Sequence, residues 1–187
     1  PPIDAIREEL VTSVEVLIGS DGNLLQPRPE DYKKIRLKTP VLLNIEMNRL
    51  RHLQTNEWKS AVISTLFSVR NQKDGLERAI HTLLQMAVDE IERGCNILIL
   101  SDQGVNSDYA AIPSLLAVSA VHHHLIRTGL RSKASIVIES GEPREVHHFA
   151  ALLGYGANAI YPYLVYTSLS HLIEKEGKVI SVSDASA

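Results

Sequence analysis

The sequence predicts an α/β fold in which parallel βαβ units resemble part of a (β/α) barrel, preceded by an irregular, partly helical arm. Two observations predict this class. From residue 61 onward, short β-branched runs alternate with long amphipathic helical patterns, as in parallel sheets with crossover helices. Residues 1–60 are instead rich in proline and charge, without a sustained strand pattern. We therefore expect one structural domain with an arm over 1–60 and an α/β core over 61–187.

The composition is that of a chain that can bury its own core, with 44% hydrophobic and 22% charged residues. It excludes the disordered, collagen-like and disulfide-rich classes. The single cysteine, Cys95, cannot form an intramolecular disulfide, and no secretory signal pattern is present. We therefore expect a cytoplasmic protein, or a plastid protein if the source is a photosynthetic eukaryote.

Charge and hydrophobicity argue against two kinds of partner. The net charge is −3 and the basic residues are scattered rather than clustered, so we do not expect a nucleic acid partner. The apolar runs are much shorter than a membrane-spanning helix requires, so we expect no membrane partner either. The sequence begins at Pro1 rather than at methionine, from which we expect a piece of a longer chain.

Each element is expected from a local pattern. In the arm, helices are expected over 5–14 and over 45–53, the second with Asn44 as its N-cap. In the core, the expected strands are 61–69, 96–101, 134–139 and 158–164. The expected helices are 76–91, 113–129, 145–153 and 168–176. The first has capping-box spacing at Asp74 and Glu77 and stops at Gly94, and the second begins at Pro113 and ends at Gly129.

Two loops at the carboxyl ends of strands are the candidate site, because ligands of parallel α/β folds bind there. The strand over 96–101 leads into Asp102, and the strand over 134–139 leads from Glu139 into Glu142. These carboxylates could face one another as an acid/base pair or hold a hard cation. Alternatively they cap helices, since acidic residues favour helix N-termini and Pro143 suits a first helical turn.

The histidine clusters His122–His124 and His147–His148 do not have the spacing of a metal site. Consecutive helical residues point about 100° apart, whereas zinc-binding helices place their ligands at i and i+4. Polar contacts on a helix face are the expected role, with a metal site assembled from both helices as the alternative.

The segment from Gly154 to Ala159 has the glycine spacing of a dinucleotide fingerprint, but a helix precedes it and a strand follows it, the reverse of what that site needs. We expect Gly154 to end the helix in a left-handed conformation and Gly156 to ease the following turn. Four nearby tyrosines are expected either at an interface or half-buried in the core: Tyr155, Tyr161, Tyr163 and Tyr166. Cys95, before an apolar strand, is expected to be an inert thiol.

Three segments together resemble one family: PPIDAIREELVTS followed by GNLL, LILSDQGVNSDYAAIPSLLAVSAVHHHLIRTGLR, and ESGEPREVHHFAALLGYGANAIYPYL. They resemble the central domain of glutamate synthase, a flavin and iron–sulfur enzyme that makes glutamate from glutamine and 2-oxoglutarate. The resemblance extends over nearly the whole chain. It departs from the family at Ala5, where a second proline is usual, and at Gln103, where arginine is frequent, which puts in doubt a contact that such an arginine would make.

The resemblance implies a connecting domain between a glutamine amidotransferase domain and an FMN-binding synthase domain of the same parent chain. It implies that this chain holds no cofactor, with FMN and the iron–sulfur cluster in other domains, and no catalytic or metal-binding residue, because the family's N-terminal nucleophilic cysteine and cluster cysteines are absent. It also implies a share in the ammonia route between the two active sites. We place the possible tunnel or interface residues in the two loops: Ser101, Asp102, Gln103, Glu139, Ser140, Gly141 and Glu142.

Two alternatives remain at this point. The chain could be an autonomous barrel-type enzyme that uses Asp102 and Glu139, or a scaffold with no share in the ammonia route.

Overall fold

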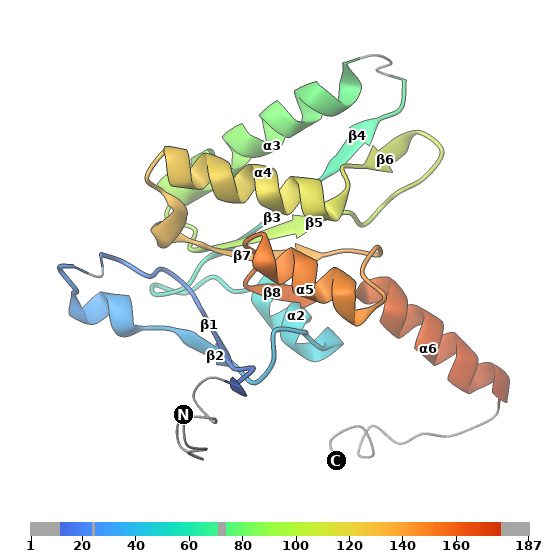
Figure 1. Cartoon of the computed structure of the whole chain (residues 1–187), viewed down its shortest axis with the longest axis horizontal. Helices are drawn as coiled ribbons and strands as arrows, with labels where there is room; N and C mark the ends of the chain where they lie inside the picture. Colours follow the sequence, from blue (N-terminus) through green and yellow to red (C-terminus); the bar gives the residue numbers. More distant parts are fainter. Residues whose placement is uncertain (1–11, 24, 71–73, 177–187) are drawn as a thin grey trace, which may run out of the picture.

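The computed structural model describes residues 12–23, 25–70 and 74–176, which are built around one parallel sheet (Figure 1). Its strand order is β3-β5-β7-β8. The strands are β3 (Ser60–Ser64), β5 (Ile97–Ser101), β7 (Ser135–Glu139) and β8 (Ala159–Tyr161), and every neighbouring pair is parallel. The α/β fold with parallel βαβ units is therefore confirmed, and the described strands form an open sheet.

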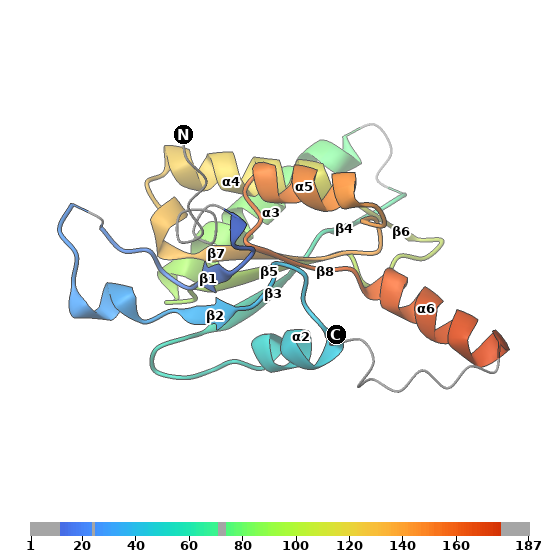
Figure 2. The ribbon, with the colours of Figure 1, turned by 60° about the horizontal axis from the view of Figure 1, so that its bottom comes forward.

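Three helices cover one face of this sheet: α3 (Gly75–Glu92), α4 (Ser114–Arg127) and α5 (Val146–Gly154) (Figure 2). In α3, the buried residues Leu83, Ala87 and Ile91 are four apart, which places them on one side of the helix. They share a core with Leu98 and Leu100 of β5. The amphipathic pattern thus predicts correctly both the helix and the face that it buries.

The arm covers the other face. It contains α2 (Asn44–Arg51) and an antiparallel pair, β1 (Val16–Ile18) and β2 (Ile35–Leu37). Its apolar side chains pack against β5, β7 and β8 in a second core: Ile18, Leu37, Leu42, Met47, Leu50, Ile97, Ile99, Val137 and Ala159. Because alternate residues of a strand point to opposite faces, β5 and β7 supply side chains to both cores.

The expectation of an arm without strands is wrong. β1 and β2 have three residues each, too few for an alternating pattern to be recognised in the sequence. The arm also forms part of the sheet edge, since Leu42 N–H donates to Ile160 O at 2.8 Å and Ile160 N–H donates to Pro40 O at 2.7 Å. The arm is thus bonded directly to β8.

The strand expected over 61–69 is broken at Thr65. The backbone N–H and Oγ1 of Thr65 both donate to Ser101 O, at 2.8 and 3.1 Å. The chain then leaves the parallel sheet, and β4 (Leu66–Ser68) pairs antiparallel with β6 (Tyr109–Ala111). One continuous β-branched run therefore supplies strands to two sheets, which its pattern does not reveal.

Several predicted helix termini are wrong. Asn44 is the first residue of α2 rather than its N-cap, and the Leu43 N–H that precedes it donates to Glu46 Oε2 at 2.8 Å. Asp74 makes no side-chain cap hydrogen bond, so the capping box expected at α3 is not formed. Residues 5–11 of the helix expected over 5–14 lie outside the described residues, and Ser13 and Val14 are not helical.

The last strand is shorter, and the last helix longer, than predicted. β8 ends at Tyr161, and α6 (Tyr163–Glu176) begins directly after Pro162, five residues before the expected start at residue 168. Two 3₁₀ turns, Pro29–Tyr32 and Arg131–Lys133, complete the elements. Within the described residues, no helix is both long and apolar enough to cross a membrane.

Candidate functional site

The two candidate loops lie side by side at the carboxyl end of the sheet. Ser101 at the end of β5 is paired with Glu139 at the end of β7. One residue further, the backbone N–H of Asp102 donates to Glu139 O at 3.1 Å. The parallel topology therefore brings the two predicted loops together.

The carboxylates within these loops lie on opposite faces of the sheet. Glu139 follows Val137 by two residues in β7, so its side chain lies on the same face as Val137, which packs against the arm. Asp102 has the parity of Leu98 and Leu100, which pack against the helices. The expectation that Asp102, Glu139 and Glu142 face one another as an acid/base pair is wrong, because alternation along the strands separates Asp102 from Glu139.

On the helix side, Asp102 is a buried and well-satisfied acceptor. Its carboxylate accepts from Ser140 Oγ at 2.6 Å and from the backbone N–H of Gly141 at 3.2 Å. Burial, together with a hydrogen bond to Asp102, raises the pKa of the Tyr163 hydroxyl. Gly141 lets this ring approach closely, since a Cβ at position 141 would lie 3.1 Å from Tyr163 Oη. Asp102 thus holds the β7 loop against the start of α6.

Glu142 caps a helix other than its own. Its Oε2 accepts from Ser114 N–H at 2.8 Å and from Ser114 Oγ at 2.5 Å, at the first residue of α4. The alternative interpretation, that Glu142 caps a helix N-terminus, is correct. The expected helix is wrong, because α5 begins only at Val146 and Pro143 lies in the loop before it.

On the arm side, Glu139 is fully buried and only half satisfied. Its Oε1 is paired with Arg51 Nη2 of α2 and accepts from Gln103 Nε2 at 3.2 Å. Its Oε2 is also buried and has no hydrogen-bond partner among the described residues. The Arg51 side chain is 31% exposed, and Gln103 is exposed. These two side chains are therefore the polar cover between Glu139 and solvent.

Arg51 is the site residue that sequence reasoning missed. It lies 88 residues before Glu139, in a segment expected to be an irregular arm. The signal that could have found it is the buried carboxylate itself, since a fully buried Glu requires a charged partner. The sequence does not say which of the 19 basic residues supplies that partner.

The other singled-out residues make structural contacts. His122 Nδ1 accepts from Arg131 Nε at 2.9 Å, and His148 Nδ1 accepts from the backbone N–H of Arg144 at 3.1 Å. The prediction of polar contacts for these histidines is confirmed. Among the described residues, no three His, Cys, Asp or Glu side chains are arranged to hold a metal ion. The Cys95 thiol has a raised pKa because of partial burial and a hydrogen bond to Glu90.

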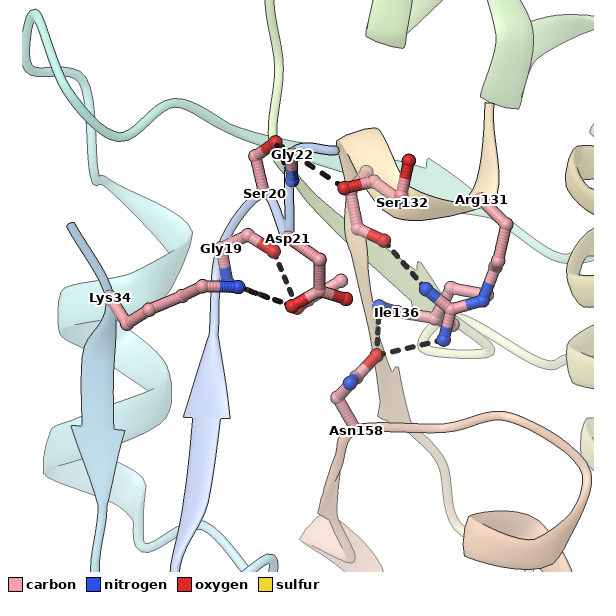
Figure 3. A network of polar contacts seen from close by, with 11 residues as sticks. Gly19, Ser20, Asp21, Gly22, Lys34, Arg131, Ser132, Ile136 and Asn158 are labelled. Carbon is pink, nitrogen blue, oxygen red and sulfur yellow. Dashed lines mark hydrogen bonds and ion pairs between the residues drawn. The ribbon is translucent and has the colours of Figure 1, made fainter. Parts of the chain in front are cut away.

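Arg131 organises the opposite, amino end of the sheet (Figure 3). Its guanidinium donates to the backbone oxygens of Ala134 and Gly156, at 2.8 and 3.0 Å, and to Asn158 Oδ1 at 3.2 Å. Asn158 Oδ1 also accepts from the backbone N–H of Ile136 at 2.9 Å. This network joins the starts of β7 and β8. Among the described residues, a buried polar atom without a hydrogen-bond partner lies at each end of the sheet: Trp58 Nε1 before β3, and Glu139 Oε2 at the end of β7.

The tyrosines attach the arm and α6 to the sheet. Tyr161 Oη donates to Asn44 Oδ1 at 3.1 Å, and Tyr166 Oη donates to Leu42 O at 2.9 Å. The two rings are 5.8 Å apart between centroids. Tyr155, in contrast, is 51% exposed. Tyr161, Tyr163 and Tyr166 are half-buried, as one of the two interpretations expects, and the interface interpretation stays a prediction.

Comparison of the sequence with known protein families shows which family the chain belongs to. Residues 1–186 match the family described as glutamate synthase central domain. The chain belongs to this family. The resemblance seen in the three sequence segments is thereby confirmed.

Its relatives are named glutamate synthases. The chain is 48% identical over 185 residues to a glutamate synthase [NADPH] large chain of Bacillus subtilis. It is 40% identical over 186 residues to ferredoxin-dependent glutamate synthase 2 of Synechocystis, and 37% identical over 189 residues to glutamate synthase [NADH] of Schizosaccharomyces pombe. These alignments cover 99%, 96% and 100% of this chain, but 12%, 12% and 9% of the relatives. The chain thus spans about a tenth of the length of the curated relatives that it matches.

Proposed function

We propose that this chain is the connecting domain of a glutamate synthase. It would join a glutamine amidotransferase domain to an FMN-binding synthase domain of the same polypeptide and wall part of the ammonia route between them. Membership of the central-domain family, and relatives that are roughly ten times longer, support this proposal. In this proposal the FMN and the iron–sulfur cluster reside in the other domains.

The observation that carries the proposal is the way in which the carboxyl-end loops use their polar groups. The carboxylates of Asp102 and Glu142 accept hydrogen bonds from neighbouring loop and helix residues. Loops fixed in this way can form a rigid wall, which suits a route that must keep ammonia away from water. The same bonding argues against an autonomous enzyme, since Asp102 has a structural role and Glu139 is covered.

The proposal is tested in the full-length enzyme by adding bulk to the carboxyl end. Ser140 is buried and Gly141 contacts Tyr163, so large substitutions there would disturb the fold. Gln103 is exposed at the same end, so Gln103→Trp adds bulk at the proposed wall. Gln103→Ala removes the hydrogen bond to Glu139 without adding bulk, and Lys133→Trp adds bulk at the amino end, where Lys133 is exposed.

The expected result is uncoupling in Gln103→Trp alone. Glutamine hydrolysis should exceed 2-oxoglutarate conversion, with ammonia released into solution, while both half-reactions measured separately keep their rates. Gln103→Ala and Lys133→Trp should stay coupled. Matched glutaminase and synthase rates in a folded Gln103→Trp enzyme would remove this surface from the proposed route.

A further inference from the structure

The parallel sheet has one covered edge and one open edge. At the β8 edge, an extended part of the arm is bonded to the strand, since Leu42 N–H donates to Ile160 O and Ile160 N–H donates to Pro40 O. At the opposite edge, β3 is paired only with β5 among the described strands. The fold thus closes one edge with an extended segment, and the same sheet presents a second edge to which such a segment can be added.

The open edge continues from β3 through Thr65 into β4. Thr65 N–H donates to Ser101 O and Thr65 O accepts from Ile112 N–H, both at 2.8 Å, so the backbone groups of this residue are turned inward. Because these groups alternate in direction along an extended chain, those of the even-numbered residues on either side are turned outward. No described residue pairs with the outward N–H and C=O groups of Val62 and Ser64.

The sequence of this edge lacks the features that keep free strands from pairing. Natural sheets protect an exposed edge with charged side chains, especially lysine, or with proline. Residues 60–69, SAVISTLFSV, contain neither a charged residue nor a proline, although Val62 is 44% exposed. This composition is typical of a strand that is paired in the functional protein.

A groove of about 480 Å³ lies directly beside the edge, where β4 runs next to α3 (Figure 1). Its apolar lining comes from both elements, with Leu66 and Phe67 from β4 and Leu83 and Met86 from α3. Arg78 also lines the groove, is exposed, and has no ion pair among the described residues. The groove therefore suits apolar side chains accompanied by a carboxylate.

The course of the edge favours an extended segment over a second copy of the chain. The edge passes from the parallel sheet to the β4–β6 pair at Thr65, so two rigid copies could pair only along the part that belongs to one sheet. An extended segment can follow the whole edge. About nine tenths of each relative lies outside the matched region, which supplies such a segment within the same polypeptide.

We propose that the β3–β4 edge binds, by strand addition, an extended segment of the parent polypeptide from outside these 187 residues. The segment pairs its backbone with Val62 and Ser64, inserts apolar side chains between β4 and α3, and places a carboxylate on Arg78. No covalent bond is formed or broken. The identity of the segment rests on the proposed function, since that function supplies the longer polypeptide.

Amide hydrogen exchange in the full-length enzyme tests whether the edge is paired. The amides of Val62 and Ser64 should exchange about tenfold or more slowly than unprotected amides, because each donates to the added segment. If either amide exchanges at the unprotected rate, the inference is overturned.

Photo-cross-linking in the same enzyme identifies the bound segment. Met86→p-benzoylphenylalanine places the photoreactive group in the groove, and a denaturing gel distinguishes cross-links within one polypeptide from those between two, which add their masses. We expect a cross-link within one polypeptide, to a peptide outside the region that matches this chain, with an acidic residue close to apolar ones. A cross-link between two polypeptides, or none, would overturn the proposed occupant.

Two substitutions at Ser64 form a matched pair. Both Ser64→Pro and Ser64→Ala remove Oγ, which accepts from Leu66 N–H, but only proline removes the outward N–H. The cross-link from position 86 should be lost in Ser64→Pro and kept in Ser64→Ala. Equal yields in two folded variants would overturn the pairing. Should proline prevent folding, exchange and cross-linking without the substitution still decide.

The coupling experiment on Gln103→Trp is independent of these results. A cross-link within the parent polypeptide, together with coupled rates in Gln103→Trp, would count against the ammonia route alone. Uncoupling in Gln103→Trp, together with an unpaired edge, would count against strand addition alone.

Discussion

The contact between His122 and Arg131 makes a prediction about acid stability at the scale of single residues. Partial burial, Arg131 and His123 lower the pKa of His122, and its Nδ1 must be unprotonated to accept from Arg131 Nε. A lowered folded-state pKa means that the unfolded chain binds the proton more tightly. The stabilising contribution is therefore present above the ordinary histidine pKa of 6.5 and is lost as the pH falls through the lower folded-state pKa.

The measurement is the free energy of urea unfolding between about pH 7.5 and pH 5. His122→Asn, whose Oδ1 can take the place of Nδ1 as an acceptor that does not titrate, should flatten the acid limb relative to the unchanged chain. His81→Asn, on an exposed position of α3, should leave the acid limb as it is. Identical acid limbs in the unchanged chain and His122→Asn would contradict the assignment.

Residue roles at the carboxyl end could be predicted only as far as local sequence determines them. The βα-loop rule correctly predicts that the loops at Asp102 and Glu139 are neighbours, because the topology of parallel strands determines this. Which face each side chain takes depends on strand boundaries within one residue, and the partner Arg51 comes from another layer. The Arg51–Glu139 pair is a tertiary contact, for which sequence spacing carries no signal.

At the scale of elements, the turn between α5 and β8 depends on Gly156 rather than on Gly154. Gly156 has a φ of +113°, and a Cβ there would lie 2.2 Å from His122 Nδ1. Gly154 is the last residue of α5, has no positive φ, and has open space around a Cβ. The expectation that Gly154 takes the left-handed conformation is wrong, because the helix continues through it.

Alanine substitution distinguishes the two glycines. Gly156→Ala should lower the free energy of unfolding by about 2 kcal/mol or more, because it combines backbone strain with a clash against His122. Gly154→Ala should be neutral or stabilising by up to about 1 kcal/mol, because alanine lowers the entropy of the unfolded chain. The measurement is urea unfolding of both variants, and a larger loss in Gly154→Ala would refute this assignment.

Elements with strong periodicity were predicted well, and those set by tertiary contacts were not. The pattern of α3 and the β-branched runs of β5 and β7 give both type and position, because each element buries residues at its own period. The break at Thr65 depends on hydrogen bonds to Ser101 O, 36 residues away. The β1–β2 pair is stabilised by packing against the sheet. The residues it packs against are distant in the sequence, so a local sequence pattern cannot predict the pair.

At the scale of the whole molecule, the arm provides one of the two layers that bury the sheet. Met47 of α2 is 1% exposed and packs in the core shared with Ile97, Ile99 and Val137. These strand residues alternate with others that support α3 and α4 on the opposite face. We therefore infer that the described parts of the arm and of the α/β core unfold as one cooperative unit.

Hydrogen exchange of a core-cavity variant tests this inference. Met47→Ala should destabilise the chain by about 2 to 5 kcal/mol, as large-to-small changes at buried positions do. If unfolding is cooperative, the loss of protection must reach α4 amides such as Val121, which is buried on the far side of the sheet, as fully as those of α2. Ile45→Ala, at a position of α2 that is 59% exposed, should change protection by less than about 0.5 kcal/mol at both places. Weakened protection confined to α2, with Val121 unchanged, would mean that the arm opens by itself while the sheet and its three helices persist. In that case the described part of the arm would be separable from the α/β core, and a rigid wall could be built only from the loops after β5 and β7.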